Sequence, residues 1–151
     1  MEQNSPVSFA VAELGKHEDP KGSNWGPDIK KYLNSVGINF AASWCAAFVY
    51  WCFREAAFKA NKPCPVVKTA GVMDHWNKGM NHRVTTPMPG DIFIMDFGKG
   101  LGHTGIVEYV IGEFIGTIEG NTNDDGSREG YEVARRKRKI SACKGFLRYE
   151  I

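Results

Sequence analysis

The sequence is poor in the features that mark several specialised classes of protein. It has only four cysteines among 151 residues, and no two of them form a C-x-x-C pair, so neither a disulfide scaffold nor a structural zinc site is indicated. No apolar run approaches the roughly 18 residues that a membrane-spanning helix needs. The formal net charge is only +2, which is too small to indicate a nucleic-acid-binding protein. We therefore expect reduced thiols, no membrane span and no nucleic-acid partner.

The length and composition suit one globular domain. With 42% hydrophobic and 24% charged residues, a chain of this size can bury a sizeable core but leaves little room for a second domain. We expect a single domain over residues 1–151. The stretch Met1–Ser5 lacks the charged and apolar regions of a signal peptide, so synthesis in the cytoplasm without a signal peptide is expected.

The most apolar stretch, residues 43–58, predicts a helix around which the rest of the chain is built. It contains no Gly or Pro and is apolar nearly all round, which is typical of a helix buried on most sides. Ser43 is the expected N-cap. Cys45 then lies in the first turn, where the helix dipole favours an anion such as a thiolate. The helix alone leaves open whether Cys45 is a nucleophile or a small buried apolar residue.

Helices are expected in the first half of the chain and strands in the second. The other expected helices lie between Ser5 and Gly15, between Pro27 and Gly37, and at about Thr69–Trp76. After Met88, β-branched and aromatic residues alternate with Gly-rich breaks. The expected strands cover residues 91–96, 104–111, 114–119, 131–139 and 145–149. This order predicts an α+β fold with an antiparallel sheet.

A cysteine nucleophile needs a base and a third group that orients the base. His103 is the candidate base, because it opens an expected strand among small residues that leave its ring approachable. The other histidines are interpreted as solvated side chains: His17, His75 and His82. The next strand ends with Glu119 and Asn121, which point the same way if the strand extends that far. A carboxylate or amide there would fix the imidazole tautomer, and a carboxylate would also favour the thiolate.

Four segments together resemble the CHAP domain, the cysteine- and histidine-dependent amidohydrolase/peptidase family related to the NlpC/P60 group. They are Trp44–Val49, Pro89–Phe93, Gly102–Val107 and Ile118–Thr122, in the family's order and approximate spacing. Upstream, Gly15–Glu18 and Asn24–Pro27 are similar to the lead-in of phage and bacterial members. The resemblance therefore covers nearly the whole chain.

The resemblance implies a papain-like fold, with N-terminal helices packed on a C-terminal antiparallel sheet of about five or six strands. It also implies cleavage of amide bonds in peptidoglycan. Cys45 would be the nucleophile, His103 the base, Glu119 the orienting group and Asn121 a supporting polar residue. The candidates for substrate contacts are Trp44, which adjoins the nucleophile, and Asn24 and Trp25 in the lead-in, whereas Trp51 and Cys52 are expected in the core.

No metal or organic cofactor is expected. Some CHAP enzymes carry an acidic, calcium-binding loop just before the nucleophile, but residues 39–43 here contain no carboxylate. If a metal were required, Asp124 and Asp125 would be the candidates.

Five consecutive cations, residues 135–139, stand out in the last part of the chain. An edge strand that is charged on its exposed face is the favoured interpretation, because such charges guard against edge-to-edge pairing. Attraction to an anionic wall polymer and binding of nucleic acid are the less favoured alternatives.

The expected function is a peptidoglycan hydrolase, either an N-acetylmuramoyl-L-alanine amidase or an endopeptidase, that works through a Cys45 thioester. Two alternatives stay open: a catalytically silent module of the same fold that binds wall peptides or a partner protein, and an acyltransferase with the same Cys/His site. The expected partner is peptidoglycan, both stem peptide and glycan. We expect a monomer that reaches the wall after release or delivery by another system.

Overall fold

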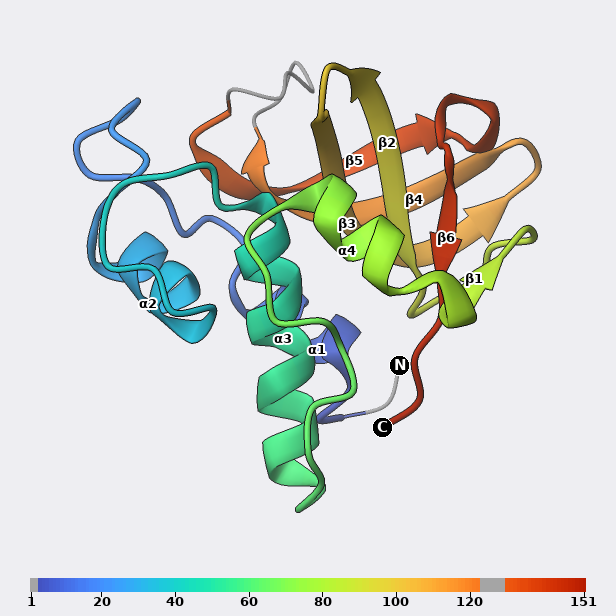
Figure 1. Ribbon diagram of the computed structural model, residues 1–151, viewed down its shortest axis with the longest axis horizontal. Coiled ribbons are helices and arrows are strands. Elements are labelled where there is room, and N and C mark those ends of the chain that lie inside the picture. The colour runs from blue at the N-terminus through green and yellow to red at the C-terminus, as the bar shows by residue number, and fades with distance from the viewer. Residues whose placement is uncertain (1–2, 123–129) are drawn as a thin grey trace.

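The computed structural model describes residues 3–122 and 130–151, which form four α-helices on one side of a six-stranded antiparallel sheet (Figure 1). The helices are α1 (Pro6–Ala12), α2 (Pro27–Ser35), α3 (Cys45–Lys59) and α4 (Val72–Lys78), with 3-10 turns at Met80–His82 and Ile140–Ala142. The strands are β1 (Arg83–Val84), β2 (Ile92–Gly98), β3 (Leu101–Ile111), β4 (Phe114–Thr122), β5 (Glu132–Lys139) and β6 (Gly145–Leu147). The predicted α+β architecture is confirmed.

The strands are ordered β1-β6-β2-β3-β4-β5 across the sheet. The central strands β2, β3 and β4 are consecutive hairpins, so the chain between residues 92 and 122 meanders as the sequence predicts. β5 lies at one edge, beside β4, which confirms the expected edge strand. The two residues of β1 pair with β6 at the other edge, a strand that the sequence pattern does not predict.

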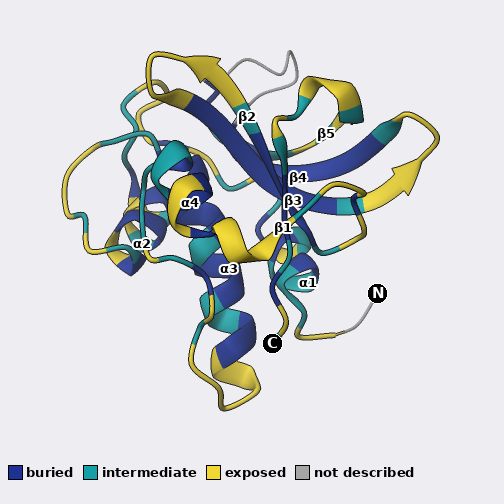
Figure 2. Cartoon of the chain, turned by 45° about the vertical axis from the view of Figure 1, so that its right-hand side comes forward, coloured by how far each residue is buried: buried dark blue, intermediate teal, exposed yellow. Residues whose placement is uncertain are grey.

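α3 is the central helix, as predicted, and packs against α1, α2, β3 and β4. Ten of its fifteen residues are buried, so it is enclosed on most sides. Large side chains such as Phe48 and Phe53 each stabilise the fold by about 1.5–3 kcal/mol when fully buried. Figure 2 shows that burial fades toward the C-terminal end of α3, where Phe58 is exposed. No helix within residues 3–122 and 130–151 has the length and apolar character needed to cross a membrane.

The start of α3 differs from the prediction. Trp44, and not Ser43, is the N-cap residue, and the helix begins at Cys45. No side chain at the N-cap makes a capping hydrogen bond. Instead the Asn121 side-chain oxygen, on β4, accepts a hydrogen bond of 2.9 Å from the Trp44 backbone N–H. A contact with the sheet, and not a local serine, therefore fixes where the helix starts.

The two faces of the sheet carry separate apolar clusters, because successive side chains of a strand point to opposite faces. The larger cluster joins the helices to the sheet, and its sheet residues are Ile92, Ile94, Ile106, Ile118, Val133 and Leu147. A smaller cluster forms from the alternate residues Phe93, Val107, Ile115 and Phe146. The helices therefore cover one face, and the second cluster lies on the other.

Candidate active site

Cys45 is the first residue of α3 and is almost completely buried, with 3% of its surface exposed. Its position in the first turn was predicted from the sequence. The first backbone N–H groups of a helix have no acceptor within the helix and carry the positive end of its dipole. Cys45 therefore lies where a negative charge on sulfur is stabilised.

His103 and Glu119 lie on the paired strands β3 and β4 and contact each other directly. The imidazole Nε2 is 2.7 Å from Glu119 Oε1, and both side chains are buried. Within the described residues the imidazole Nδ1 makes no hydrogen bond of standard geometry, but Cys45 lies close enough to interact with the ring. The structure thus brings together Cys45, His103 and Glu119, the three residues that the sequence singled out.

The electrostatics of this group favour a charged imidazole. Burial alone lowers the pKa of His103, but the contacts with Cys45 and Glu119 and the charges of both partners outweigh it and raise the pKa to about 9. Near neutral pH an imidazolium is therefore stable beside the thiol. This is the condition under which a cysteine exists as a reactive thiolate.

Glycines leave the room that these contacts need. A Cβ atom at Gly105 would lie 2.7 Å from Glu119 Cγ and 2.9 Å from the carbonyl oxygen of Ile118. A Cβ at Gly102, next to His103, would lie 2.6 Å from the carbonyl oxygen of Met95. Real Cβ atoms do not approach so closely, so the small neighbours noted in the sequence are required for the packing around His103.

Glu119 has two further partners that the sequence did not reveal. Arg138, on β5, donates to both carboxylate oxygens at 2.6 Å each, and the Thr117 hydroxyl donates at 2.6 Å. Burial raises the pKa of Glu119, but the bonds from Arg138 and His103 outweigh this effect and lower the pKa to about 2. Glu119 is therefore ionised throughout the neutral range.

The run of cations on β5 alternates between two environments, as predicted for an edge strand. Arg135, Lys137 and Lys139 are exposed, whereas Arg136 and Arg138 are half-buried. Arg135 pairs with Glu108 at the surface, while Arg138 turns toward Glu119. The sequence showed the alternation but not which cation reaches the site.

Asn121 does not share the direction of Glu119, which corrects the expectation from period-2 geometry. The pairing of β4 with β5 shifts between Glu119 and Thr122, and Asn121 adopts a positive φ of 58°. This bulge turns the Asn121 amide toward the start of α3, where it accepts from the Trp44 N–H and donates to the Gly130 carbonyl oxygen. Asn121 thus supports the backbone beside Cys45.

Trp44 does not line a substrate groove, so that prediction is wrong. Its side chain is completely buried and stacks on Tyr32 at 5.6 Å between ring centroids. The indole Nε1 donates a 2.8 Å hydrogen bond to Glu18, a buried carboxylate in the lead-in loop. The buried Trp51 and Cys52 confirm the core positions expected for them.

Asn24 and Trp25 lie in the loop that joins α1 to α2, and both are half-buried. Trp25 packs against the large apolar cluster, and Asn24 adopts a positive φ of 55°. The hydrogen bond that Trp44 donates to Glu18 ties this loop to the N-terminal end of α3. A role for Asn24 and Trp25 in substrate binding stays a prediction.

His75 is buried, although the sequence suggested a solvated side chain. Its Nε2 lies 2.9 Å from the Tyr149 hydroxyl, and burial lowers its pKa to about 4. Folding of α4 over the sheet causes this burial, which no local pattern signals. His17 and His82 are exposed, as predicted.

Metal-ligating side chains are not clustered in the part of the chain that the structure describes. No group of three or more His, Cys, Asp or Glu residues there could hold a metal ion. Asp124 and Asp125, the candidates named from the sequence, lie outside the described residues.

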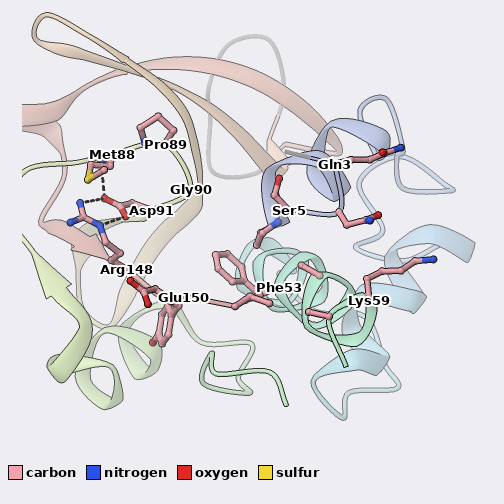
Figure 3. Close-up of a pocket in the computed structure, with 16 residues that line it drawn as sticks. Gln3, Ser5, Phe53, Lys59, Met88, Pro89, Gly90, Asp91, Arg148 and Glu150 are labelled. Atoms are coloured by element: carbon pink, nitrogen blue, oxygen red, sulfur yellow. Dashed lines mark hydrogen bonds and ion pairs between the residues drawn. The ribbon is translucent and has the colours of Figure 1, made fainter. Parts of the chain in front are cut away.

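A cavity of about 500 Å³ lies at the C-terminal end of α3, away from Cys45 (Figure 3). Figure 3 places Phe53 and Lys59 of α3 on one side and the ion pair of Asp91 with Arg148 on the other. None of the three residues Cys45, His103 and Glu119 lines it. This cavity is therefore separate from the candidate active site.

Solved structures of similar fold include Ly7917, at 17% identity and a TM-score of 0.53, and a wild-type endolysin, LysIME-EF1, at 16% and 0.52. A structure of Ly7917 "with the hydrolyzing product of MDP" has 16% sequence identity to this chain and a TM-score of 0.52. Each alignment covers 95% of this chain but only 60–62% of the other, so the chain spans about three fifths of their length. No curated protein matches the sequence. The sequence model of the CHAP domain matches residues 37–121, more than half of the chain and the part that holds Cys45, His103 and Glu119, and the chain therefore belongs to the CHAP domain family.

Proposed function

We propose that this protein is a peptidoglycan hydrolase that cleaves an amide bond through a thioester on Cys45. The observation that carries the proposal is the buried series of Cys45, His103 and Glu119, in which the imidazole contacts the carboxylate at 2.7 Å and Cys45 lies close enough to interact with the ring. The membership of the CHAP family supports peptidoglycan as the substrate class. The similar structure that holds a hydrolysis product supports hydrolysis on this fold.

In the first half of the reaction the Cys45 thiolate attacks the carbonyl carbon of the scissile amide. A C–S bond forms, and the electrons of the C=O double bond move to its oxygen. Collapse of this intermediate breaks the C–N bond, and His103 transfers a proton to the leaving amine. The products of this half-reaction are a free amine and an acyl group on Cys45.

In the second half water resolves the thioester. His103, now neutral, takes a proton from water as the oxygen attacks the acyl carbon. The C–S bond breaks, a carboxylic acid leaves, and the thiolate–imidazolium pair is restored. Glu119 accepts a hydrogen bond from His103 throughout and stabilises the imidazolium whenever it forms.

The start of α3 offers the donors for the oxyanion. Backbone N–H groups in the first turn of a helix point outward and need acceptors. The Trp44 N–H is not one of these donors, because Asn121 already accepts its hydrogen bond. We therefore assign the oxyanion site to the first turn that begins at Cys45.

Mass spectrometry of fragments released from purified peptidoglycan tests the proposal. A free lactyl carboxylate on muramic acid would indicate an amidase, and a new amino terminus within the peptide would indicate an endopeptidase. Products joined to an added amine, in place of free carboxylates, would indicate acyl transfer. If the parent protein binds the wall but releases no fragment from it, the proposal is contradicted and a binding module is favoured.

A further inference from the structure

The carboxylate of Glu119 is held by an arginine as well as by His103. Arg138 Nε donates to Oε2 and Arg138 Nη2 donates to Oε1, each at 2.6 Å, which is the bidentate geometry of an arginine–carboxylate pair. The Thr117 hydroxyl donates to Oε2 and His103 Nε2 contacts Oε1. Each oxygen therefore has two partners, and the carboxylate cannot rotate without breaking several of these bonds.

This arrangement fixes which imidazole nitrogen carries a proton. An ionised carboxylate has no proton to donate, so the 2.7 Å contact with His103 requires a proton on Nε2. A neutral His103 then has its lone pair on Nδ1. Since Nδ1 has no other hydrogen bond within the described residues, it is the atom that exchanges protons with the Cys45 thiol.

The guanidinium of Arg138 is enclosed where its charge is effective. Only 13% of its side chain is exposed, and Glu119 is fully buried, so solvent screens this pair weakly. The ring of Phe93 lies 5.8 Å from the guanidinium and 6.0 Å from the His103 ring, between centroids in the latter case. The smaller apolar cluster thus packs against both ends of the chain of bonds that runs from Arg138 to His103.

We propose that Arg138 is a positioning residue of the active site, which keeps Glu119 ionised and oriented so that His103 holds its Nε2 proton and presents Nδ1 to Cys45. The inference rests on the proposed function for its role in turnover. The effect of Arg138 on the protonation of His103 can be measured without a substrate.

The chain offers a matched control on the same strand. Arg135 also forms a bidentate pair, with both oxygens of Glu108 at 3.0 Å, but its side chain is 55% exposed. Replacing Arg135 by Met removes an arginine–carboxylate pair from β5 and leaves Glu119 untouched. Effects seen in Arg138→Met and absent in Arg135→Met belong to the active site.

The test is the rate of Cys45 alkylation by iodoacetamide as a function of pH. Without the guanidinium, Glu119 stays buried but loses two charged hydrogen bonds, so it takes up a proton at higher pH and stops stabilising the imidazolium. In Arg138→Met the acidic limb of the alkylation profile should move up by about one pH unit or more, the size expected when a charged partner is lost. A shift to lower pH would mean that the arginine charge acts directly on His103, and this result would overturn the proposal.

Turnover on soluble peptidoglycan fragments gives the second measurement. We expect kcat of Arg138→Met to fall by about tenfold or more while KM stays within about twofold, because the orienting group does not touch the substrate. Arg138→Lys keeps the charge but not the fork of donors, so its alkylation profile should stay near that of the parent while kcat falls several-fold. A lysine variant with the full parental kcat would contradict a positioning role.

A third measurement does not depend on the stability of any Arg138 variant. Nitrogen NMR of histidine-labelled Cys45→Ala, at a pH where the ring is neutral, should show the proton of His103 on Nε2. A proton on Nδ1 would overturn the proposal. If the parent releases nothing from peptidoglycan, the proposed function fails, while the alkylation and NMR results still decide the role of Arg138.

Discussion

Cys45 and His103 are held in place by two very different kinds of surroundings. Cys45 is carried by α3, a helix buried in the large apolar cluster among many neighbours. His103 is oriented by a short chain of polar contacts that runs through Glu119 to Arg138. The position of Cys45 thus depends on packing, and that of His103 depends on hydrogen bonds and charge.

This contrast indicates how well the surroundings of Cys45 and those of His103 tolerate a substitution. Packing around a helix is shared among many side chains, so a small loss at one position can be partly accommodated. A buried polar chain has no such redundancy, because each missing partner leaves a donor, an acceptor or a charge unsatisfied. Substitutions at Cys45, Glu119 and Asn121 separate the loss of a reacting group from the loss of a supporting contact.

The largest effect is expected from Cys45→Ala. Removing the sulfur removes the covalent step, so clearance of purified peptidoglycan should fall below a few per cent of the parent rate, in line with the roughly 10⁴-fold or larger losses seen when nucleophiles are removed. The fold should persist, because only a small group is lost. Circular dichroism and a turbidity assay measure the two outcomes, and substantial clearance by this variant would rule out Cys45 as the nucleophile.

The order in which the cysteines of the parent protein are alkylated provides an independent check on the role of Cys45. Burial raises the pKa of the Cys64 thiol, and it raises the pKa of Cys143 to about 11. These thiols should therefore react slowly near neutral pH, where Cys45 beside an imidazolium should react fast. Peptide mapping that finds Cys64 or Cys143 labelled before Cys45 would argue against an activated thiolate.

A smaller but still large loss is expected from Glu119→Gln, which keeps the size of the side chain and removes its charge. Without the carboxylate the imidazolium is less stable, so the acidic limb of the rate profile should move to higher pH and kcat should fall by more than about tenfold. Binding to the wall should change little. The measurement is a pH series of turnover and thiol alkylation, and coincident alkylation curves for parent and variant would remove Glu119 from its role as the orienting group.

Asn121→Ala should act through stability more than through the pH profile. It leaves the buried Trp44 N–H without its acceptor, at a cost of about 1–3 kcal/mol in the free energy of unfolding. We expect a several-fold loss of kcat with an unchanged acidic limb, since His103 keeps its partner. Urea unfolding and a pH–rate series test this, with the exposed Asn81→Ala as the control, and a shifted limb would show that Asn121 acts on the base.

The pKa shifts predict a smaller, pH-dependent effect on stability. The pKa of His103 is raised from 6.5 to about 9, so its contribution is fully present below pH 6.5 and is lost as the pH rises through 9. The difference in Tm between the parent and His103→Gln should therefore shrink between pH 6.5 and 9. His75 is the opposite case: its pKa falls to about 4, so its contribution is present above pH 6.5 and is lost as the pH falls through 4. Thermal unfolding of the parent, His103→Gln and His75→Gln between pH 4 and 9 measures both trends, and a constant difference in Tm between the parent and His103→Gln would contradict the assigned pKa.

The smallest effect is expected from chelators. Because the described residues hold no cluster of metal-ligating side chains, EDTA should leave the rate of peptidoglycan clearance unchanged. The assay needs a calcium-dependent hydrolase as a positive control. Loss of activity in EDTA and its recovery with Ca²⁺ would direct attention to Asp124 and Asp125.

The sequence was most informative where a pattern depends on local physics. The apolar run without Gly or Pro predicted α3, and small residues around His103 predicted an approachable ring. The sequence alone does not predict contacts between elements that are distant along the chain. One of five adjacent cations reaches Glu119, and only the side-chain contacts of the folded chain show that it is Arg138, whose backbone pairs with Ile115. The burial of Trp44 involves a hydrogen bond to Glu18 in a distant loop. The orientation of the Asn121 side chain depends on a bulge that no residue type in the sequence predicts.

Gly105 has a consequence for the way in which this protein can be inactivated. It carries no functional group, yet an added methyl would overlap Glu119, the Ile118 carbonyl and the Phe93 ring at 2.6–2.9 Å. The set of single changes that disable the site is therefore larger than the set of groups that perform chemistry. A genetic selection for inactive protein should therefore recover substitutions of alanine for glycine on β3, as well as changes to the cysteine, the histidine and the glutamate.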